Sequence, residues 1–484
     1  MRNNLMTNVL IIGSGVGGLS AGIILAKLGF QVTVVEKNRL PGGLMRSYTR
    51  GGTECDVGVH YLGALGHGEI LQKLFNYLGV ASKIPVERMG KDGVIDKYIF
   101  DNFTFDLPEG LDAYQENLRN TFPDEHRQIA EIMKRLRHSA EKMRSLDFLF
   151  PAQNDFSMLE QSEPLGKILT QLQCSPGLRA VIGVPCCWMG VSLEECPCFY
   201  HNMILATYLF SSWRLACSGS KMADVFAERL KSLGGKIIQA EEVEKILVNA
   251  RVAEGIQLKS GQMLKARIVI GAVHPKIVLN MLPKGAVKPS YRKRISQLED
   301  TPGIFSVHAE LDASSHKAIP HNIFKVNTDK SGNILDMKFY QLKKSEKGGK
   351  NTFSILTSGK PELWRPWENT MTGWRGSDYV EEKEKRAWTL IHEAEEIFGP
   401  LCDAKLVDAY TPLTIRDWVN SPGGSAYGVL RSSKQLLSTA LLNRTSVRGL
   451  FLAGQSAMAP GILGTILGSL STVKLIVRNL KLET

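Results

Sequence analysis

The sequence predicts an α/β protein in which a parallel β-sheet is joined to a second, antiparallel sheet. An apolar run at residues 9–12 is followed by a glycine-rich turn and by apolar residues at helical spacing as far as Leu28. A second apolar run at residues 31–36 completes a strand–helix–strand unit, the building block of parallel sheets. Residues 302–360 alternate between apolar and polar side chains, a pattern typical of antiparallel strands.

The glycine-rich turn reads GSGVGG and has the spacing of a dinucleotide-binding motif. Gly13 permits the tight turn, Gly15 lets a pyrophosphate approach the backbone, and Gly18 allows close packing of helix and strand. The helix that follows offers free N–H groups to phosphates. Glu36 ends the second strand, where a carboxylate accepts hydrogen bonds from a ribose and disfavours a 2′-phosphate. The unit therefore predicts a dinucleotide site without NADP.

Length, composition and net charge limit the number of domains and the kinds of partner that this chain can have. At 484 residues, roughly two to four domains are expected. The hydrophobic content of 43% and charged content of 22% are ordinary for a globular protein. The net charge of +11 suits an anionic ligand or an acidic lipid surface. Because Lys and Arg form no compact run, we expect no nucleic-acid partner.

Further elements follow along the chain. Residues 126–144 form a charged helical pattern, and residues 222–233 an amphipathic helix. Expected strands lie at 236–240, 243–248, 252–259, 266–273 and 449–453, the last before another helix. The apolar, aromatic stretch 199–213 suits plain core, an apolar tunnel or membrane contact. Three tryptophans at 364, 367 and 374 suggest a lid or a membrane-contact loop.

Three features of the sequence bear on a metal site, a targeting signal or a membrane span. Eight cysteines show no repeated CxxC pairs, so we expect free thiols in a reducing compartment and no metal. The N-terminal apolar stretch resembles a signal peptide, but its motif glycines favour the dinucleotide unit. Residues 449–473 carry no charge and could span a bilayer. Their many glycines and polar side chains favour a buried cofactor-binding element instead.

Two stretches distinguish the type of dinucleotide. Gly42–Gly43, followed by Arg46, resembles the extended signature of the glutathione-reductase-like flavoproteins. The sequence VRGLFLAGQ, which ends at Gln455, resembles the other half of that signature. Many members carry an acid where this chain has Gln455, although an amide also binds a hydroxyl. This resemblance implies that the cofactor is FAD.

Four blocks together resemble the phytoene desaturase superfamily, and within it the retinol-saturase and carotenoid-isomerase branch. They are GSGVGGLSAGIILAKLGFQVTVVEKNRLPGG, DVGVHYLG, TPLTIRDWVNSPGGSAYGV and GLFLAGQSAMAPGILGTILGS. The resemblance implies a glutathione-reductase-like Rossmann domain that binds FAD and is discontinuous in sequence. It also implies a substrate domain with a mixed β-sheet capped by helices. We assign residues 1–75, 215–285 and 440–484 to the first domain, and 76–214 and 286–439 to the second.

The motifs and the resemblance together assign the candidate site residues. The cofactor-binding set is Gly13, Gly15, Gly17, Gly18, Glu36, Lys37, Gly42, Gly43, Arg46, Val243, Gly454, Gln455, Gly461 and Ile462. The candidate catalytic residues are His60, Tyr61 and Tyr427. His60 and Tyr61 could donate a proton or orient a polyene, but His60 could equally be structural. Tyr427 could line the substrate face of the flavin or simply pack there.

The resemblance implies an FAD-dependent oxidoreductase that acts on C=C bonds of a conjugated, hydrophobic polyene. The block DVGVHYLG favours the saturase branch and thus reduction, which needs an electron donor that the sequence does not name. Desaturation or cis–trans isomerisation on the same scaffold is the alternative. Two others are a non-catalytic lipid or prenyl escort protein, which the intact glycines disfavour, and a flavin amine oxidase. We expect a cytoplasmic protein with peripheral membrane contact.

Overall fold

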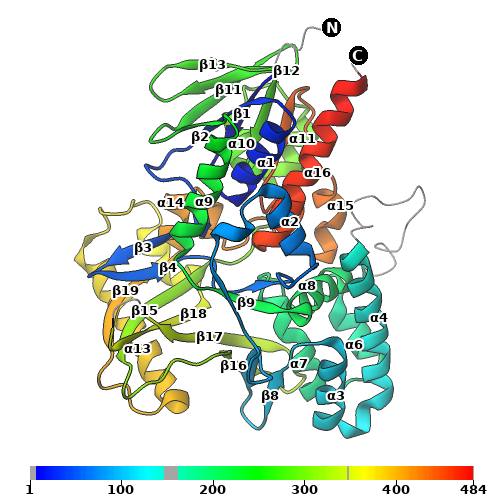
Figure 1. Ribbon diagram of the computed structural model, residues 1–484, viewed down its shortest axis with the longest axis vertical. Coiled ribbons are helices and arrows are strands. Elements are labelled where there is room, and N and C mark those ends of the chain that lie inside the picture. The colour runs from blue at the N-terminus through cyan, green and yellow to red at the C-terminus, as the bar shows by residue number, and fades with distance from the viewer. Residues whose placement is uncertain (1–6, 146–161, 346–347, 483–484) are drawn as a thin grey trace.

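The computed structural model describes residues 7–145, 162–345 and 348–482 (Figure 1). A five-stranded parallel sheet has the order β10-β2-β1-β14-β20. Its strands are β1 (Asn8–Ile12), β2 (Gln31–Val35), β10 (Lys236–Ile238), β14 (Ile268–Gly271) and β20 (Leu450–Leu452). Strands from the two ends of the sequence, β1 and β20, thus belong to one sheet, with β14 between them.

Both faces of this parallel sheet are buried. Val9 and Ile11 of β1 join one apolar cluster, whereas Leu10 and Ile12 join another on the opposite face. Helices α1 (Val16–Lys27), α9 (Gly219–Ser232) and α16 (Gly461–Leu482) cover the first face. The three-stranded antiparallel sheet of β11 (Val243–Asn249), β12 (Val252–Leu258) and β13 (Met263–Lys265) covers the second. Burial on both faces explains why β1 is a continuous apolar run.

Helix α16 contains the long apolar stretch that raised the question of a membrane span. Among the described residues, Gly461–Leu480 alone is a helix long and apolar enough to cross a membrane. Half of that stretch is buried inside the protein, where Ile466 and Leu467 pack in the cluster that contains Leu19 of α1. A helix buried in a protein core can be as long and as apolar as a helix that spans a membrane.

The second sheet is mixed and has seven strands in the order β19-β15-β18-β17-β16-β7-β8. Its pairs are antiparallel except for β16 with β7. The strands are β7 (Asp96–Ile99), β8 (Thr104–Leu107), β15 (Ile304–Asp312), β16 (Asn322–Thr328), β17 (Ile334–Lys344), β18 (Lys350–Ser358) and β19 (Lys405–Tyr410). The antiparallel pattern predicted at 302–360 corresponds to β15–β18.

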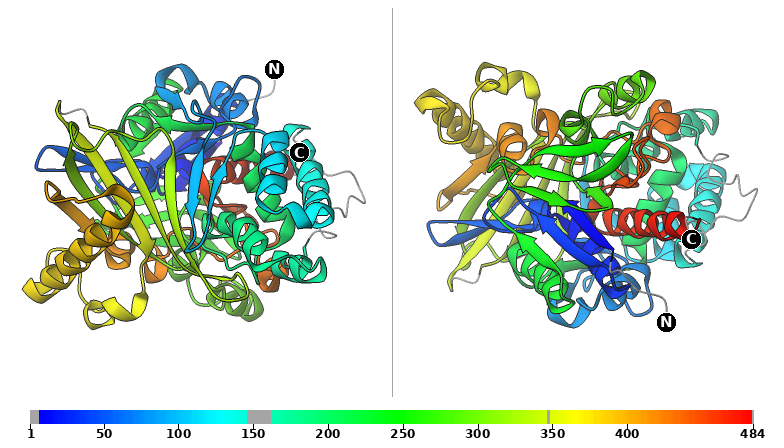
Figure 2. Two further views of the ribbon diagram at one scale, coloured as in Figure 1. Left: turned by 90° about the horizontal axis from the view of Figure 1, so that it is seen from below. Right: turned by 90° about the horizontal axis from the view of Figure 1, so that it is seen from above.

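Helices pack on both sides of the mixed sheet (Figure 2). Helix α13 (Gly376–Phe398) packs on one face through Leu390 and Ile391. On the other side Phe324 and Phe339 pack against a group of helices. That group comprises α3 (Leu111–Thr121), α4 (His126–Ser145), α6 (Leu165–Gln171), α7 (Pro176–Cys187) and α8 (Cys198–Phe210). The predicted α/β class, with a Rossmann-type unit and a mixed sheet capped by helices, is confirmed.

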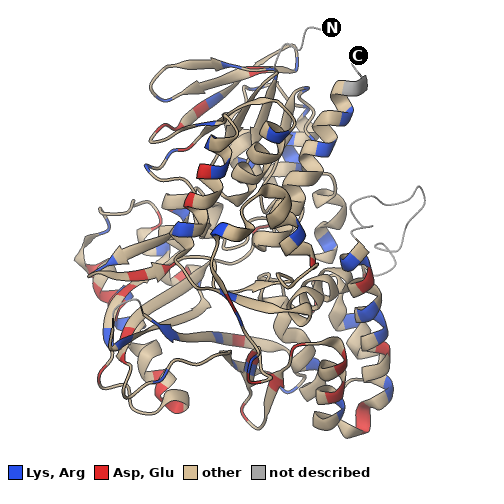
Figure 3. Cartoon of the chain, viewed as in Figure 1, with Lys and Arg blue, Asp and Glu red and all other residues tan. Residues whose placement is uncertain are grey.

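Smaller elements complete the described chain. They are β3 (Ser47–Arg50), β4 (Thr53–Asp56), β5 (Leu62–Gly63), β6 (Val86–Arg88), β9 (Ser212–Leu215), α2 (Ile70–Leu78), α10 (Pro275–Met281), α11 (Pro289–Ser296), α12 (Pro361–Trp364), α14 (Pro412–Val419) and α15 (Leu436–Thr439). On the face shown in Figure 3, Lys and Arg lie on many elements among acidic residues rather than in one stripe.

The tryptophan cluster differs from the lid or membrane loop suggested by the sequence. Trp364 is buried and stacks on Phe305, with ring centroids 5.5 Å apart. Its indole N–H donates to the Gly359 carbonyl at 2.8 Å. Trp374 is 85% exposed, so only this residue has the position expected of a surface contact. The cluster is therefore split between core and surface, because α12 turns the first indole inward.

Candidate active site

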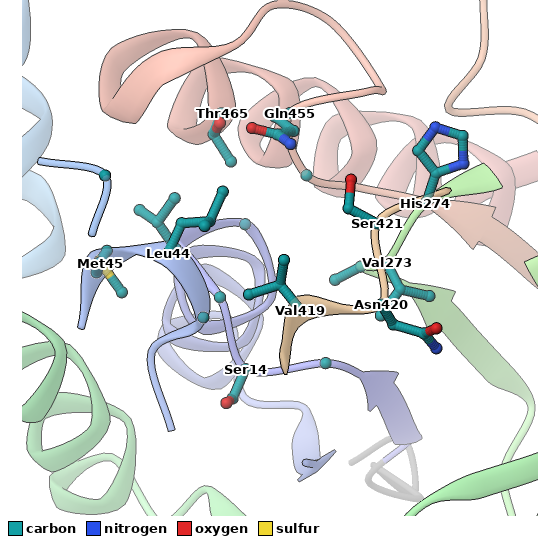
Figure 4. A pocket seen from close by; sticks show the side chains of 18 of the residues that line it. Ser14, Leu44, Met45, Val273, His274, Val419, Asn420, Ser421, Gln455 and Thr465 are labelled. Atoms are coloured by element: carbon teal, nitrogen blue, oxygen red, sulfur yellow. The ribbon is translucent and has the colours of Figure 1, made fainter. Parts of the chain in front are cut away.

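A first cavity lies at the carboxyl ends of the parallel strands (Figure 4). This is the edge at which α/β sheets bind their ligands. The segments that follow β1, β2 and β14 line it, together with residues before α16. Side chains labelled in Figure 4 include Ser14, Leu44, Met45, Val273, His274, Val419, Asn420, Ser421, Gln455 and Thr465.

Glycines form the wall of this cavity where a pyrophosphate would approach. Gly13 has φ +95°, and an added Cβ would lie 2.8 Å from Val273. A Cβ on Gly17 would lie 2.5 Å from Cα of Gly454. A Cβ on Gly15 would meet nothing within 4 Å, so Gly15 borders open space. Helix α1 begins there without a side-chain cap, which leaves its first N–H groups free for an anion.

The acidic end of β2 is held in place by the glycine turn. Glu36 is 6% exposed, and its carboxylate accepts hydrogen bonds from the backbone N–H of Ser14 at 3.0 Å and from its hydroxyl at 2.5 Å. Lys37 donates to the backbone carbonyl of Asp417 at 2.6 Å, and burial lowers the pKa of its ammonium group. Asn38 donates to the Trp418 carbonyl at 3.0 Å. The last turn of α14 is therefore fastened to the residues that follow β2.

The opposite wall comes from the segment between β20 and α16. Gly454, Gln455 and the beginning of α16 line the cavity there. Arg431 is 4% exposed and donates to the backbone carbonyls of Ser456 and Thr439. Burial lowers the pKa of this guanidinium group. The buried arginine thus fixes the backbone next to Gln455.

Most of the predicted cofactor-binding residues line the first cavity. They are Gly13, Gly15, Gly17, Glu36, Lys37, Gly43, Val243, Gly454, Gln455, Gly461 and Ile462. Three do not. A Cβ on Gly18 would lie 2.0 Å from the Gly13 carbonyl oxygen, so Gly18 serves packing within the motif. Gly42 has φ +129° beside Ala223, and Arg46 contacts Asp224 at 3.1 Å and the Pro41 carbonyl at 2.7 Å.

Other lining residues were not predicted from the sequence. Ser14, which lies inside the glycine motif, and His274, which follows β14, were within reach because parallel strands end at the same edge. The Nε2 atom of His274 lies 2.9 Å from Asp300. Asn420 has φ +56° at the end of α14, and no sequence pattern placed its loop beside β2.

A second cavity, of about 480 Å³, adjoins the first. Apolar and aromatic side chains line it, including Tyr61, Trp188, Met203, Tyr208, Phe324, Phe339 and Met458. Helix α8 presents residues 199–200, 203–204 and 207–208 to this cavity, at the spacing of successive helical turns. Residues such as Leu205 and Leu209 of the same helix pack in the core. The stretch 199–213 is therefore both core and cavity wall.

The two cavities share a wall that contains two of the candidate catalytic residues. His60 and Tyr427 line both cavities, as do Val59 and Leu356. Neither ring nitrogen of His60 has a hydrogen-bond partner within the described part of the chain. Burial lowers the pKa of His60 to about 4, although nearby Asp56 opposes this shift. The imidazole is therefore neutral at pH 7 and offers a donor and an acceptor to a bound molecule.

The two tyrosines differ in their surroundings. Burial raises the pKa of Tyr427 to about 12, so that its phenol stays protonated at neutral pH. Tyr61 lines the second cavity only, and its hydroxyl donates to Asp96 at 3.2 Å. Its ring lies 4.7 Å from that of Tyr208 and 6.2 Å from that of Trp188, measured between centroids. His60 and Tyr427 therefore lie at the junction of the two cavities, and Tyr61 lies within the second cavity.

The first cavity fits a dinucleotide with a flavin. Gly15 leaves open space at a helix N-terminus for phosphates, and Glu36 offers a carboxylate for a ribose. The cavity continues past these groups to His60 at the shared wall, which leaves room for a ring system beyond the phosphates. Fold and cavity together define a dinucleotide-binding oxidoreductase of the flavoprotein class.

Comparison with known proteins gives the family. The model for flavin containing amine oxidoreductases matches residues 16–472, and the chain belongs to this family. It is an oxidoreductase whose cofactor is FAD. An "All-trans-retinol 13,14-reductase" of Danio rerio is 26% identical and covers 98% of this chain and 87% of its own length. A "Prolycopene isomerase 2, chloroplastic" of an Oncidium hybrid cultivar is 23% identical, with coverages of 94% and 80%.

Solved structures agree with this fold. Putrescine oxidase bound to putrescine superposes with a TM-score of 0.67 at 15% identity, covering 98% of this chain and 99% of its own. At that identity the similarity shows the fold alone. The relatives confirm the predicted resemblance to the superfamily of phytoene desaturases, retinol saturases and carotenoid isomerases.

Proposed function

We propose that this protein reduces a C=C bond of a conjugated, hydrophobic polyene of the retinoid or carotenoid class. The observation that carries the proposal is the apolar, aromatic cavity of about 480 Å³ that meets the cofactor cavity at His60 and Tyr427. Its volume is in the usual range for small-molecule sites. The names of the relatives, a retinol reductase and a carotenoid isomerase, support the same substrate class.

The residues would divide the work as follows. The glycine turn, Glu36 and the segment at Gly454–Gln455 would hold FAD, which supplies two-electron hydride chemistry when bound. The aromatic and methionine side chains would orient the polyene and exclude water. Tyr61 and Tyr427 are protonated phenols that can donate a proton to a substrate carbon, and neutral His60 can orient either partner.

The division into two domains is part of this proposal. Residues 1–75, 215–285 and 440–484 would bind the cofactor, and residues 76–214 and 286–439 would bind the substrate. It is supported by β7 and β8, which come from the first substrate stretch yet pair in one sheet with β15–β19 from the second. The second cavity draws most of its side chains from these two stretches.

The test is an anaerobic half-reaction. The bound flavin is reduced chemically, polyenes such as retinol, polyenoic acids and carotenoids are added, and flavin and polyene absorbance are followed together. We expect flavin reoxidation matched by loss of one conjugated double bond. Isomerised polyene without reoxidation would instead favour isomerase activity. In a parallel experiment with oxidised flavin, flavin reduction by a more saturated carotenoid would favour desaturation.

An amine oxidase activity is the second candidate, because Tyr61, Trp188 and Tyr208 gather aromatic rings in the second cavity. Such rings would suit a cationic amine as well as a polyene. Anaerobic mixing of the oxidised protein with aliphatic and aromatic amines tests this reading. Flavin bleaching by an amine, together with no reaction with any polyene, would replace the proposed function.

The partners follow from the chemistry. Reduction needs an electron donor outside the chain, and a polyene dissolves in lipid, so we propose peripheral contact of a cytoplasmic protein with a membrane. Leu437, which is 86% exposed, and Leu441, which is 64% exposed, are available for such contact beside Lys434. Sedimentation with anionic and neutral vesicles tests it. Equal amounts of protein in the supernatant with and without vesicles would contradict it.

A further inference from the structure

A buried carboxyl group lies directly behind the second cavity. Asp96, at the beginning of β7, is 0% exposed. Its Oδ2 accepts a hydrogen bond from the Tyr61 hydroxyl at 3.2 Å, and its Oδ1 accepts one from the Asn322 amide at 2.8 Å. Tyr61 lines the cavity and Asp96 does not. The carboxyl group therefore reaches the cavity only through the phenol.

The hydrogen bonds around Asn322 determine which oxygen of Asp96 can carry a proton. The Asn322 carbonyl oxygen accepts from the Arg214 guanidinium at 2.8 Å and from the Gln341 amide at 3.0 Å. Arginine can only donate, so this atom is an acceptor and the amide nitrogen must donate to Asp96 Oδ1. A proton on Asp96 therefore resides on Oδ2 and is donated to the Tyr61 oxygen, whose own O–H is then free to point into the cavity. When Asp96 is ionised, the Tyr61 hydroxyl donates to Oδ2 instead.

The surroundings of Asp96 keep this proton available near neutral pH. Burial raises the pKa of Asp96 to about 7, although the hydrogen bonds from Asn322 and Tyr61 and the charge of Arg214 oppose the shift. Tyr61, Tyr98 and Tyr208 are the titratable groups nearby, and burial raises the pKa of each phenol. They remain neutral at pH 7, which leaves Arg214 as the charge that faces the carboxyl group.

We propose that Asp96 stores a proton and passes it to Tyr61 when Tyr61 protonates the substrate. The proposal rests on the proposed reduction of a polyene. The Tyr61 O–H bond breaks as a C–H bond forms at one carbon of the C=C bond. Reduced FAD, when bound, would supply the two electrons and the hydrogen that the other carbon needs. The Asp96 Oδ2–H bond breaks as the phenol O–H bond re-forms. Asp96 is left as a carboxylate, which water protonates through Tyr61 after product release.

The variant Asp96→Asn tests the relay, since it keeps the shape and the hydrogen bond from Asn322 but carries no transferable proton. In the unmodified protein, the single-turnover rate should fall as pH rises through about 7, because Asp96 ionises. In Asp96→Asn the rate at pH 6 should fall about tenfold to a hundredfold. The decline through neutral pH should also disappear. An unchanged rate and pH profile in the variant would overturn the relay.

A matched control is Tyr98→Phe. The Tyr98 hydroxyl is buried without a hydrogen-bond partner in the described part of the chain, and it does not line the cavity. Its removal should change neither the pH profile nor the flavin content.

If Asp96 were purely structural, Asp96→Asn would lower the melting temperature and flavin content while the pH profile kept its shape. That result would overturn the relay as well.

A spectroscopic measurement separates the relay from the proposed function. Infrared difference spectra of the resting holoenzyme should show a protonated-carboxyl band that titrates near pH 7 and is missing in Asp96→Asn. No such band would overturn the relay, whatever the activity. If the unmodified protein reduces no polyene at any pH, the proposed function fails and the relay's role fails with it. Reduction with the same pH profile in both proteins rejects the relay alone.

Discussion

The two cavities meet at one wall but are built from different parts of the polypeptide. The first is formed mainly by backbone at glycines and strand ends, such as Gly13, Gly15 and Gly17. The second is formed by large side chains from α8, β16 and β17 and from the segment at residues 58–63. The difference teaches that cofactor recognition depends on positions where a side chain is forbidden. Under the proposed function, substrate recognition would depend on side chains of the second cavity that can change without disturbing the cofactor.

The largest effect is expected when a side chain enters the first cavity. Gly15→Val should keep the fold, because φ is −62° and an added Cβ meets nothing within 4 Å. The valine would occupy space meant for phosphates, and FAD affinity should fall about a hundredfold (~2.7 kcal/mol). Flavin titration of the apoprotein measures it. Gly22→Ala in the same helix meets only side-chain atoms and should bind FAD normally. Full flavin content in Gly15→Val would contradict the assignment.

Two buried histidines, His60 at the shared wall and His308 in β15, predict a pH-dependent stability. Burial lowers the pKa of His60 and of His308 to about 4. Between pH 6.5 and 4 the unfolded chain binds protons that the folded protein does not. The contribution of these two histidines to the free energy of unfolding should therefore decrease as pH falls through this range, by about 3 kcal/mol for each histidine, and level off below pH 4. Asp96 partly offsets this decrease, because its raised pKa stabilises the folded protein as pH falls below about 7.

Urea unfolding at a series of pH values measures this dependence. His60→Leu should remove about half of the decrease that the two histidines cause, since their pKa shifts are alike. An identical pH dependence in the parent protein and in this variant would show that solvent reaches His60 and that burial does not lower its pKa.

Neighbouring positions on α8 separate cavity from core. Ile204 lines the second cavity, whereas Leu205 is 1% exposed in the core. Ile204→Trp should fill the cavity and weaken polyene binding about tenfold (~1.4 kcal/mol), with FAD content and melting temperature unchanged. Leu205→Trp should instead destabilise the fold by about 1–3 kcal/mol through overpacking. Polyene titration and thermal unfolding distinguish the two, and loss of FAD from Ile204→Trp would show that the cavities are not independent.

The smallest effect is expected at the end of α14, which is fastened to the residues after β2. Lys37→Met removes the hydrogen bond to the Asp417 carbonyl and should loosen residues 417–420 at the first cavity. FAD affinity should fall about threefold (~0.6 kcal/mol). Lys27→Met removes an exposed hydrogen bond from a lysine to a backbone carbonyl, that of Tyr77, away from the cavity and serves as the control. Equal FAD affinities in the two variants would remove the loop from the cofactor site.

The difference between the two cavities also explains which parts of the structure could be predicted from the sequence. The first cavity was predictable because its residues are clustered in motifs whose spacing reflects one local geometry, as in GSGVGG. The seven-stranded sheet was only partly predictable, since β7 and β8 join it across more than two hundred residues. The contact between Asp96 and Asn322 could not be predicted from the sequence, because it depends on the parallel pairing of β7 with β16. No sequence period relates two side chains that are neighbours by strand pairing alone.

The contact between the glycine turn and α16 has a consequence for biosynthesis. The Ser469 hydroxyl donates to the Gly17 carbonyl at 2.8 Å, although the two residues are 452 positions apart. A Cβ on Gly17 would also collide with Gly454, so turn and loop must meet closely. A nascent chain on the ribosome therefore has a glycine turn but no closed flavin cavity until α16 has emerged. Flavin loading should be a late event, and translation in low riboflavin should leave a pool of apoprotein that can still be rescued.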